Sequence, residues 1–219
     1  PADRLSAAGD ENTKAIWICS PNNPTGNDLQ REEMERVLRE FDGIVVIDEA
    51  YADFSSQQCF RQQIAQYPNF IVLNTFSKAW GCAAIRLGMA FASQEIIALF
   101  NKVKYPYNIN SLTQQKALEM LSRRADIAKW QGIILQERGA VMTAFAELPI
   151  CKQVFPTSSN FFLTRVTDAN AIYDYLVSKG IIVRNRHRVQ MCGNCLRVTI
   201  GTPVENTTLL AALRQYKPV

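Results

Sequence analysis

The stretch from residue 15 to residue 92 constrains the fold most, because short apolar runs alternate with polar or amphipathic segments there. The runs are AIWIC (15–19), IVVI (44–47), FIVL (70–73) and LGMAFA (87–92). Short runs rich in branched and aromatic residues are typical of strands buried on both faces of a sheet. They predict an α/β fold with a mostly parallel sheet.

A helix is predicted between the first two runs, over residues 28–41. Met34, Val37, Leu38 and Phe41 recur there at helical spacing, and Asn27 is the expected N-cap. Strand, helix and strand in this order predict a βαβ unit.

The pattern changes after residue 92. Helices are predicted over residues 94–103, 113–121, 127–148, 169–179 and 204–216, and strands over 160–166, 181–184 and 195–200. The helix 127–148 is long enough to link two domains. We therefore expect a large domain over residues 1–148 and a small α+β domain over 149–219.

Composition excludes several classes of function. The chain has 219 residues, of which 47% are hydrophobic and 20% charged, with a formal net charge of +4. It contains no long Lys/Arg run of the kind that binds nucleic acid and no apolar run of membrane-spanning length. The cysteines are scattered, and no export signal precedes the first strand. We expect a reduced, cytoplasmic protein that binds neither nucleic acid nor membranes.

Four polar features follow the predicted strands, where open α/β sheets hold their ligands. They are the turn SPNNPTG (20–26), the segment DEAY (48–51), the segment TFSK (75–78) and Arg86. Each has an ordinary alternative: a plain turn, an acidic surface turn, a solvated lysine and an arginine paired with a carboxylate. Their combination in this order is more informative than any one of them.

Together they resemble the class I and II aminotransferases, which are fold-type I enzymes that use pyridoxal 5'-phosphate (PLP). The resemblance rests on the NPTG turn, the D-x-x-Y pair and the string S-K-A-x-G-x-x-x-x-R, and it extends from residue 15 to the C-terminus. It implies that Lys78 bonds covalently to the cofactor and later moves a proton on the substrate. It also implies that Asp48 keeps the pyridine nitrogen protonated, while Tyr51 and Asn23 donate to the phenolic oxygen.

The remaining roles implied by the resemblance concern anions. Thr75, Ser77 and Arg86 would hold the cofactor phosphate. Arg197 would bind the substrate. With Arg184, which is 13 positions earlier, it resembles the histidinol-phosphate aminotransferase branch. The amine donor would then be histidinol phosphate, the acceptor the 2-oxo acid 2-oxoglutarate, and the enzyme a homodimer.

Other functions stay open. A related PLP enzyme, such as threonine-phosphate decarboxylase or an aromatic or other amino-acid aminotransferase, would share the cofactor site. A non-catalytic α/β binding or dimerisation module is the alternative from another class.

Two further features concern the small domain and the start of the chain. The segment CGNC (192–195) lies near His187, the single histidine, but a zinc site needs four ligands, so we expect a hairpin turn and no metal.

Intact members of the family carry a further N-terminal segment that completes the cofactor site. We therefore expect this chain to be the larger C-terminal portion of a subunit, and to bind PLP weakly alone.

Overall fold

The computed structural model describes residues 2–217, although of Ser6 only the backbone is described. The chain divides into two compact units. The first comprises the residues up to Asn22 together with Asp28–Ile127, and the second comprises Asn23–Asn27 and the residues from Ala128 onward. Both units share the long helix α5 (Arg124–Ala146). The predicted domains, 1–148 and 149–219, stay a prediction.

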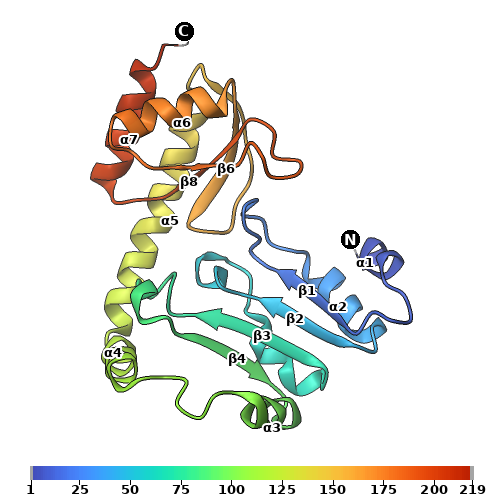
Figure 1. The fold of residues 1–219 in the computed structure, drawn as a ribbon. Helices are drawn as coiled ribbons and strands as arrows, with labels where there is room; N and C mark the ends of the chain where they lie inside the picture. Colours follow the sequence, from blue (N-terminus) through green and yellow to red (C-terminus); the bar gives the residue numbers. More distant parts are fainter. Residues whose placement is uncertain (1, 218–219) are drawn as a thin grey trace. The chain divides into compact units, whose positions relative to one another are not determined.

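A mixed sheet forms the centre of the first unit (Figure 1). Its strands are β1 (Ala15–Cys19), β2 (Ile44–Asp48), β3 (Phe70–Thr75) and β4 (Gly88–Ala92), in that spatial order. β1, β2 and β3 run parallel, whereas β4 pairs with β3 antiparallel. The predicted α/β class with a mostly parallel sheet is confirmed.

Helix α2 (Arg31–Glu40) covers one face of this sheet. It buries Met34, Val37 and Leu38 against strand residues such as Val45 and Phe70. Each side chain of this size contributes about 1.5–3 kcal/mol when it is removed from water.

The predicted cap of α2 was wrong. Gln30 occupies the N-cap position and makes no side-chain cap bond. The side-chain oxygen of Asn27 instead accepts a hydrogen bond from the Thr25 hydroxyl at 2.6 Å. The helix therefore begins later than the apolar pattern suggested.

Other elements of the first unit are helical. They are α1 (Ala2–Ala8), α3 (Gln94–Val103), α4 (Ser111–Ser122) and the short 3-10 helices η1 (Ala52–Phe54), η2 (Phe60–Gln66) and η3 (Ala83–Ile85). We did not predict α1, because its seven residues show no long apolar periodicity.

The second unit is built on an antiparallel sheet. β5 (Cys151–Val154), β6 (Phe161–Val166), β7 (Arg184–Asn185) and β8 (Cys195–Thr199) lie in the order β5-β6-β8-β7. Helices α6 (Ala169–Ser178) and α7 (Pro203–Gln215) pack with α5 around a core that includes Phe145, Phe162 and Leu196.

The predicted strand 181–184 is mostly absent, for a reason visible at the end of α6. Gly180 has a φ of 74° and donates to the carbonyl of Val177 at 2.9 Å, and Ile181 donates to that of Leu176 at 2.9 Å. This is a Schellman cap. The amide of Ile181 therefore closes the helix instead of joining the sheet, and strand pairing starts at Arg184.

The segment CGNC forms the predicted turn. The amide of Cys195 donates to the carbonyl of Cys192 at 3.0 Å, and both thiols are free and buried. His187 is exposed beside it, and its Nδ1 accepts from the amide of Asn194 at 3.1 Å.

Candidate active site

The topology of the first sheet brings three of the polar features to one edge. Asp48 ends β2 and Thr75 ends the parallel neighbour β3. Because β4 is antiparallel, its first residue, Gly88, pairs with Thr75 at the same edge. Arg86 therefore lies just before that pairing, and the residue after it, Leu87, accepts a hydrogen bond from the amide of Phe76 at 3.1 Å.

Asp48 lines a cleft at this edge. Its Oδ1 accepts a hydrogen bond from the amide of Ala50 at 2.9 Å, and the side chain is half-buried. The cleft has a volume of about 410 Å³ and is also lined by Asn74, Thr75 and Met89. This size is within the range of small-molecule sites. A carboxylate at such a place can pair with the protonated nitrogen of a bound ring.

Lys78 lies beside Tyr51. The Lys78 Nζ atom is 5.1 Å from the centre of the Tyr51 ring, within the range of a cation–π contact. Tyr51 is buried, whereas Lys78 is exposed on a tight turn. The amide of Gly81 closes this turn by donating to the carbonyl of Lys78 at 3.0 Å. The amine is thus held next to the phenol but remains accessible to a ligand.

Thr75 and Ser77 are brought together by a local hydrogen bond. The Thr75 hydroxyl accepts from the amide of Ser77 at 3.0 Å and donates to the carbonyl of Leu87 at 3.1 Å. The second bond fastens the end of β3 to the residue after Arg86. Arg86 has the left-handed φ of 54° and is exposed, and its Nη1 donates to the carbonyl of Ala83 at 3.0 Å.

The remaining predicted residues, Asn23, Arg184 and Arg197, belong to the second unit. Arg197 donates from Nη1 to the side-chain oxygen of Asn23 at 2.8 Å, and its guanidinium lies 4.6 Å from the centre of the Phe161 ring. The contact of Phe161 with Arg197 could not be predicted from the sequence, because an aromatic residue inside the predicted strand 160–166 is indistinguishable from an ordinary core residue.

The NPTG turn depends on its glycine. Gly26 has a φ of 79°, and a Cβ there would lie 2.2 Å from the hydroxyl oxygen of Thr157. The carbonyl of Gly26 also accepts from the amide of Ser158 at 2.7 Å. A larger residue would clash, so the turn's position is set by backbone packing against residues 157–158.

Arg184 lies directly opposite Arg197 in the antiparallel pair β7–β8. Side chains at directly opposite positions share one face of a sheet and are close neighbours, and like charges there repel. An anion bound between two guanidinium groups would offset that repulsion.

Comparison with known proteins gives the family. The family model described as aminotransferase class I and II matches residues 2–213. The chain belongs to this family. The resemblance drawn from the NPTG, D-x-x-Y and S-K-A segments is therefore confirmed.

Individual relatives agree with the family assignment. Over 216 residues the chain is 58% identical to the histidinol-phosphate aminotransferase of Bacteroides fragilis, a match that covers 99% of this chain and 63% of that protein. The crystal structure of the histidinol-phosphate aminotransferase from Clostridium acetobutylicum matches with a TM-score of 0.89 at 25% identity, covering 97% of this chain and 66% of that one. The structure of the Sinorhizobium meliloti histidinol-phosphate aminotransferase in complex with pyridoxal-5'-phosphate has the same fold, with a TM-score of 0.84 at 24% identity, covering 96% of this chain and 59% of that one. The chain thus spans less than two thirds of the curated relative's length.

Across residues 2–217, no group of three or more His, Cys, Asp or Glu side chains is arranged to hold a metal ion. None of the helices found there is long and apolar enough to cross a membrane.

Proposed function

We propose that the full-length protein containing this chain transfers an amino group from histidinol phosphate to 2-oxoglutarate and uses PLP as its cofactor. The identity of 58% to a histidinol-phosphate aminotransferase carries this proposal. The place of Asp48 in the cleft and the contact of Lys78 with Tyr51 support it. The Sinorhizobium meliloti histidinol-phosphate aminotransferase, whose structure is a complex with PLP, supports it as well. Activity is proposed for the full-length protein because the chain spans 63% of the relative.

The ring of the cofactor would be held by residues at the ends of β2 and β3. PLP, when bound, supplies an electron sink for the carbon that loses a proton. Asp48 would hold the proton on the pyridine nitrogen, and Tyr51 would donate to the phenolic oxygen, as would Asn23. Lys78 Nζ would form the covalent attachment and, once the amine of the donor has displaced it, would take the proton from the donor carbon as a free amine.

The cofactor phosphate would be bound by Thr75, Ser77 and Arg86. Thr75 and Ser77 are already joined through the Thr75 hydroxyl, and Leu87, next to Arg86, accepts from that same hydroxyl. The Thr75 hydroxyl has a single proton, so it would have to turn from the Leu87 carbonyl to the phosphate when the cofactor binds. Hydroxyls and a guanidinium provide the charge-assisted hydrogen bonds that a phosphate requires.

Substrate recognition is assigned to Arg184 and Arg197. Their direct opposition across β7 and β8 supports a dianionic phosphate as the group that they bind. The ring of Phe161 beside Arg197 would limit the orientations that its guanidinium can adopt toward that group.

We further propose that the protein is a cytoplasmic homodimer. Apolar side chains gather in the region of α3 and α4, where Val103, Tyr105, Tyr107, Leu112 and Leu118 are each more than half exposed, Tyr107 to 97%. Large exposed apolar surfaces are typical of protein–protein contacts. The six cysteines, all free, suit a reducing compartment.

Product analysis tests the proposed reaction. The full-length protein, loaded with PLP, is given histidinol phosphate and 2-oxoglutarate, and glutamate is measured. Glutamate that depends on both substrates is expected. Release of carbon dioxide from threonine phosphate, with no glutamate formed, would point instead to the decarboxylase alternative. Absence of both, with no PLP bound, would favour a non-catalytic module.

A further inference from the structure

Glu49 is a buried carboxylate that none of the proposed roles uses. It directly follows Asp48, and its relative exposure is 2%. Within residues 2–217 no other Asp, Glu, Lys or Arg side chain is buried to this degree. Burying a carboxylate is costly unless hydrogen-bond donors satisfy it, so its surroundings must supply such donors.

Two donors from one short segment satisfy this carboxylate. Oε1 accepts a hydrogen bond from the backbone amide of Phe60 at 2.7 Å, and Oε2 accepts one from the thiol of Cys59. Burial raises the pKa of Glu49, whereas these two hydrogen bonds and the charge of Arg61 act in the opposite direction. The carboxylate thus ties the end of β2 to the start of η2.

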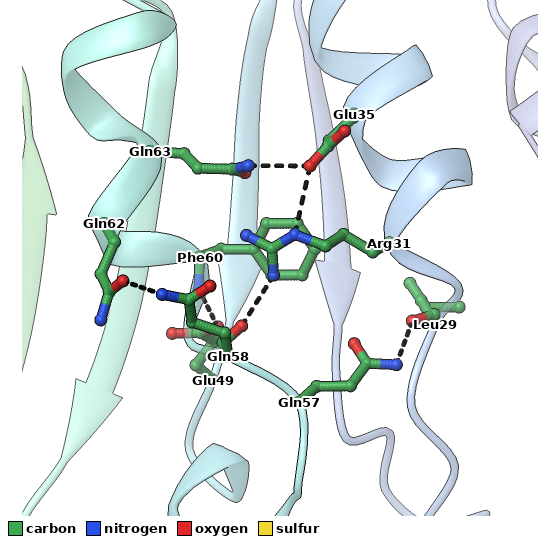
Figure 2. Close-up of polar contacts among 9 residues, drawn as sticks. All are labelled: Leu29, Arg31, Glu35, Glu49, Gln57, Gln58, Phe60, Gln62 and Gln63. Carbon is green, nitrogen blue, oxygen red and sulfur yellow. Dashed lines mark hydrogen bonds and ion pairs between the residues drawn. The ribbon is translucent and has the colours of Figure 1, made fainter.

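The start of η2 is itself firmly held, as Figure 2 shows. The Phe60 ring is buried, lies 4.6 Å from the guanidinium of Arg31 and meets Phe70 edge-on. Arg31 Nη1 donates to the carbonyl of Gln58 at 2.9 Å, and its Nε pairs with Glu35 at 3.1 Å. Phe60 is therefore a fixed point to which Glu49 can be anchored.

The backbone of Glu49 is also fixed, on both sides. Its amide donates to the carbonyl of Leu73 at 2.8 Å, and its carbonyl accepts from the amide of Ala52 at 3.0 Å. Asp48 precedes these bonds, and Tyr51 lies inside the turn that the second one closes. Asp48 and Tyr51 thus lie on either side of the residue whose side chain carries the anchor.

We propose that Glu49 is a positioning residue, whose carboxylate fastens the segment 48–51 to the amide of Phe60 and so holds Asp48 and Tyr51 in place at the cofactor. This inference rests on the proposed PLP site. An apolar side chain could fill the same space at lower cost in stability. It could not accept the hydrogen bond of the Phe60 amide, so it would not fix the orientation of the turn at residues 49–52 relative to η2.

Three variants of the full-length holoenzyme distinguish the effect of the side chain's length from the effect of its charge. Glu49→Gln keeps an oxygen at the same distance for the Phe60 amide but has no charge. Glu49→Asp keeps the charge but is one methylene too short. Glu49→Ala removes both. A positioning role requires an oxygen that can accept from the Phe60 amide. We therefore expect Glu49→Gln to behave like the wild type and Glu49→Asp to behave like Glu49→Ala.

The diagnostic readout is the pH titration of the absorbance band of the lysine-bound cofactor. A hydroxyl that donates to the phenolic oxygen weakens that oxygen's hold on the neighbouring proton, so a misplaced Tyr51 raises the pKa of the band. We expect an upward shift of about one pH unit in Glu49→Ala and Glu49→Asp and less than about 0.3 unit in Glu49→Gln. In the first two variants kcat falls while KM changes little.

Asn69→Ala is the matched control. Asn69 donates to the carbonyls of Phe41 and Gly43, at 3.0 and 2.7 Å, at the opposite end of the same sheet. This change is expected to lower the melting temperature and leave the titration of the band unchanged. If the Glu49 variants lose stability like Asn69→Ala but keep the wild-type titration, Glu49 is only structural and the inference is wrong. A wild-type protein without any such band would instead contradict the proposed function.

Discussion

Arg197 donates a hydrogen bond to the side-chain oxygen of Asn23 at 2.8 Å, although the two residues are 174 positions apart in the chain. The contact fastens the NPTG turn to strand β8. It also directs the guanidinium, because one of its nitrogens is committed to a fixed acceptor. A lysine at this position could keep the charge but not the planar fork.

The Arg197 contact predicts a graded loss of substrate binding. We expect Arg197→Lys to raise KM for histidinol phosphate by about tenfold and Arg197→Ala by about a hundredfold, since a charged hydrogen bond contributes roughly 1.5–3 kcal/mol. Steady-state kinetics of the full-length protein measures this. Arg165→Lys is the control, because the guanidinium of Arg165 also lies near an aromatic ring in the same unit, 5.6 Å from the centre of the Phe155 ring. An equal rise in KM in the control would show that the effect is general to the sheet.

Asp48 gives the second prediction. Asp48→Asn removes the charge that would keep the cofactor nitrogen protonated. We expect kcat to fall by at least about a hundredfold, which corresponds to a fall of about two units in the pKa of that nitrogen. Asp42, near the other end of β2, provides the comparison Asp42→Asn, which should leave kcat unchanged. Near-normal turnover by Asp48→Asn with bound PLP would rule out the role given to Asp48.

The N-terminus of α7 predicts a pH-dependent change in stability. Thr202 and Glu205 form a capping box, and the hydrogen bonds from the Thr202 amide and hydroxyl lower the pKa of Glu205 below its usual value of 4.5. A lowered carboxyl pKa stabilises the fold above the unfolded-state value and loses that effect as pH falls through the folded-state value. Thr202→Ala is expected to cost about 1 kcal/mol at pH 7 and less below about pH 4. Denaturant unfolding at both pH values measures it.

Thr207→Ala is the appropriate comparison for this experiment. The Thr207 hydroxyl donates to the carbonyl of Pro203 at 2.8 Å in the same helix, and it takes no part in the capping box. Its removal should leave stability nearly unchanged at both pH values. A constant difference between Thr202→Ala and wild type at every pH would argue against the Glu205 linkage.

Cys59 is predicted to be a slow-reacting thiol. Burial, together with the hydrogen bond to Glu49, raises the pKa of Cys59 to about 12. The thiolate is the reactive form, so alkylation by iodoacetamide at pH 8 should be at least about a hundredfold slower than for a free thiol and should accelerate as pH rises toward the pKa. Peptide mass mapping over time measures this. Labelling of Cys59 at the rate of a free thiol would contradict its burial and its hydrogen bond to Glu49.

Much of the fold could be predicted from periodicity, because residues 15–92 contain strands whose burial leaves a clear apolar signature. The predictions that were wrong depend on local hydrogen bonds. Asn27 bonds to Thr25 and does not cap α2, and the amide of Ile181 closes α6, which delays strand pairing to Arg184. Such competition between side chains, caps and sheets does not appear in hydrophobic patterns.

The candidate site was predictable to a similar extent. Asp48, Thr75 and Lys78 could be found because each follows an apolar run, and the carboxyl ends of β2 and β3 meet at one edge. The direct opposition of Arg184 and Arg197 could not be predicted, since it depends on the register of β7 and β8. Glu49 lies inside the DEAY segment, but only the structure shows that its carboxylate is buried and where its donors come from.

Lys78 is the residue proposed to bond to the cofactor, and chemical trapping can identify that residue without relying on kinetics. The full-length protein is loaded with PLP, reduced with borohydride, digested and mapped by mass spectrometry. Lys102, near the end of α3, is an exposed internal control. We expect a pyridoxyl group on Lys78 and not on Lys102, and its loss in Lys78→Ala. A pyridoxyl group on another lysine of the wild-type protein, with Lys78 unmodified, would show that the assignment of Lys78 is wrong.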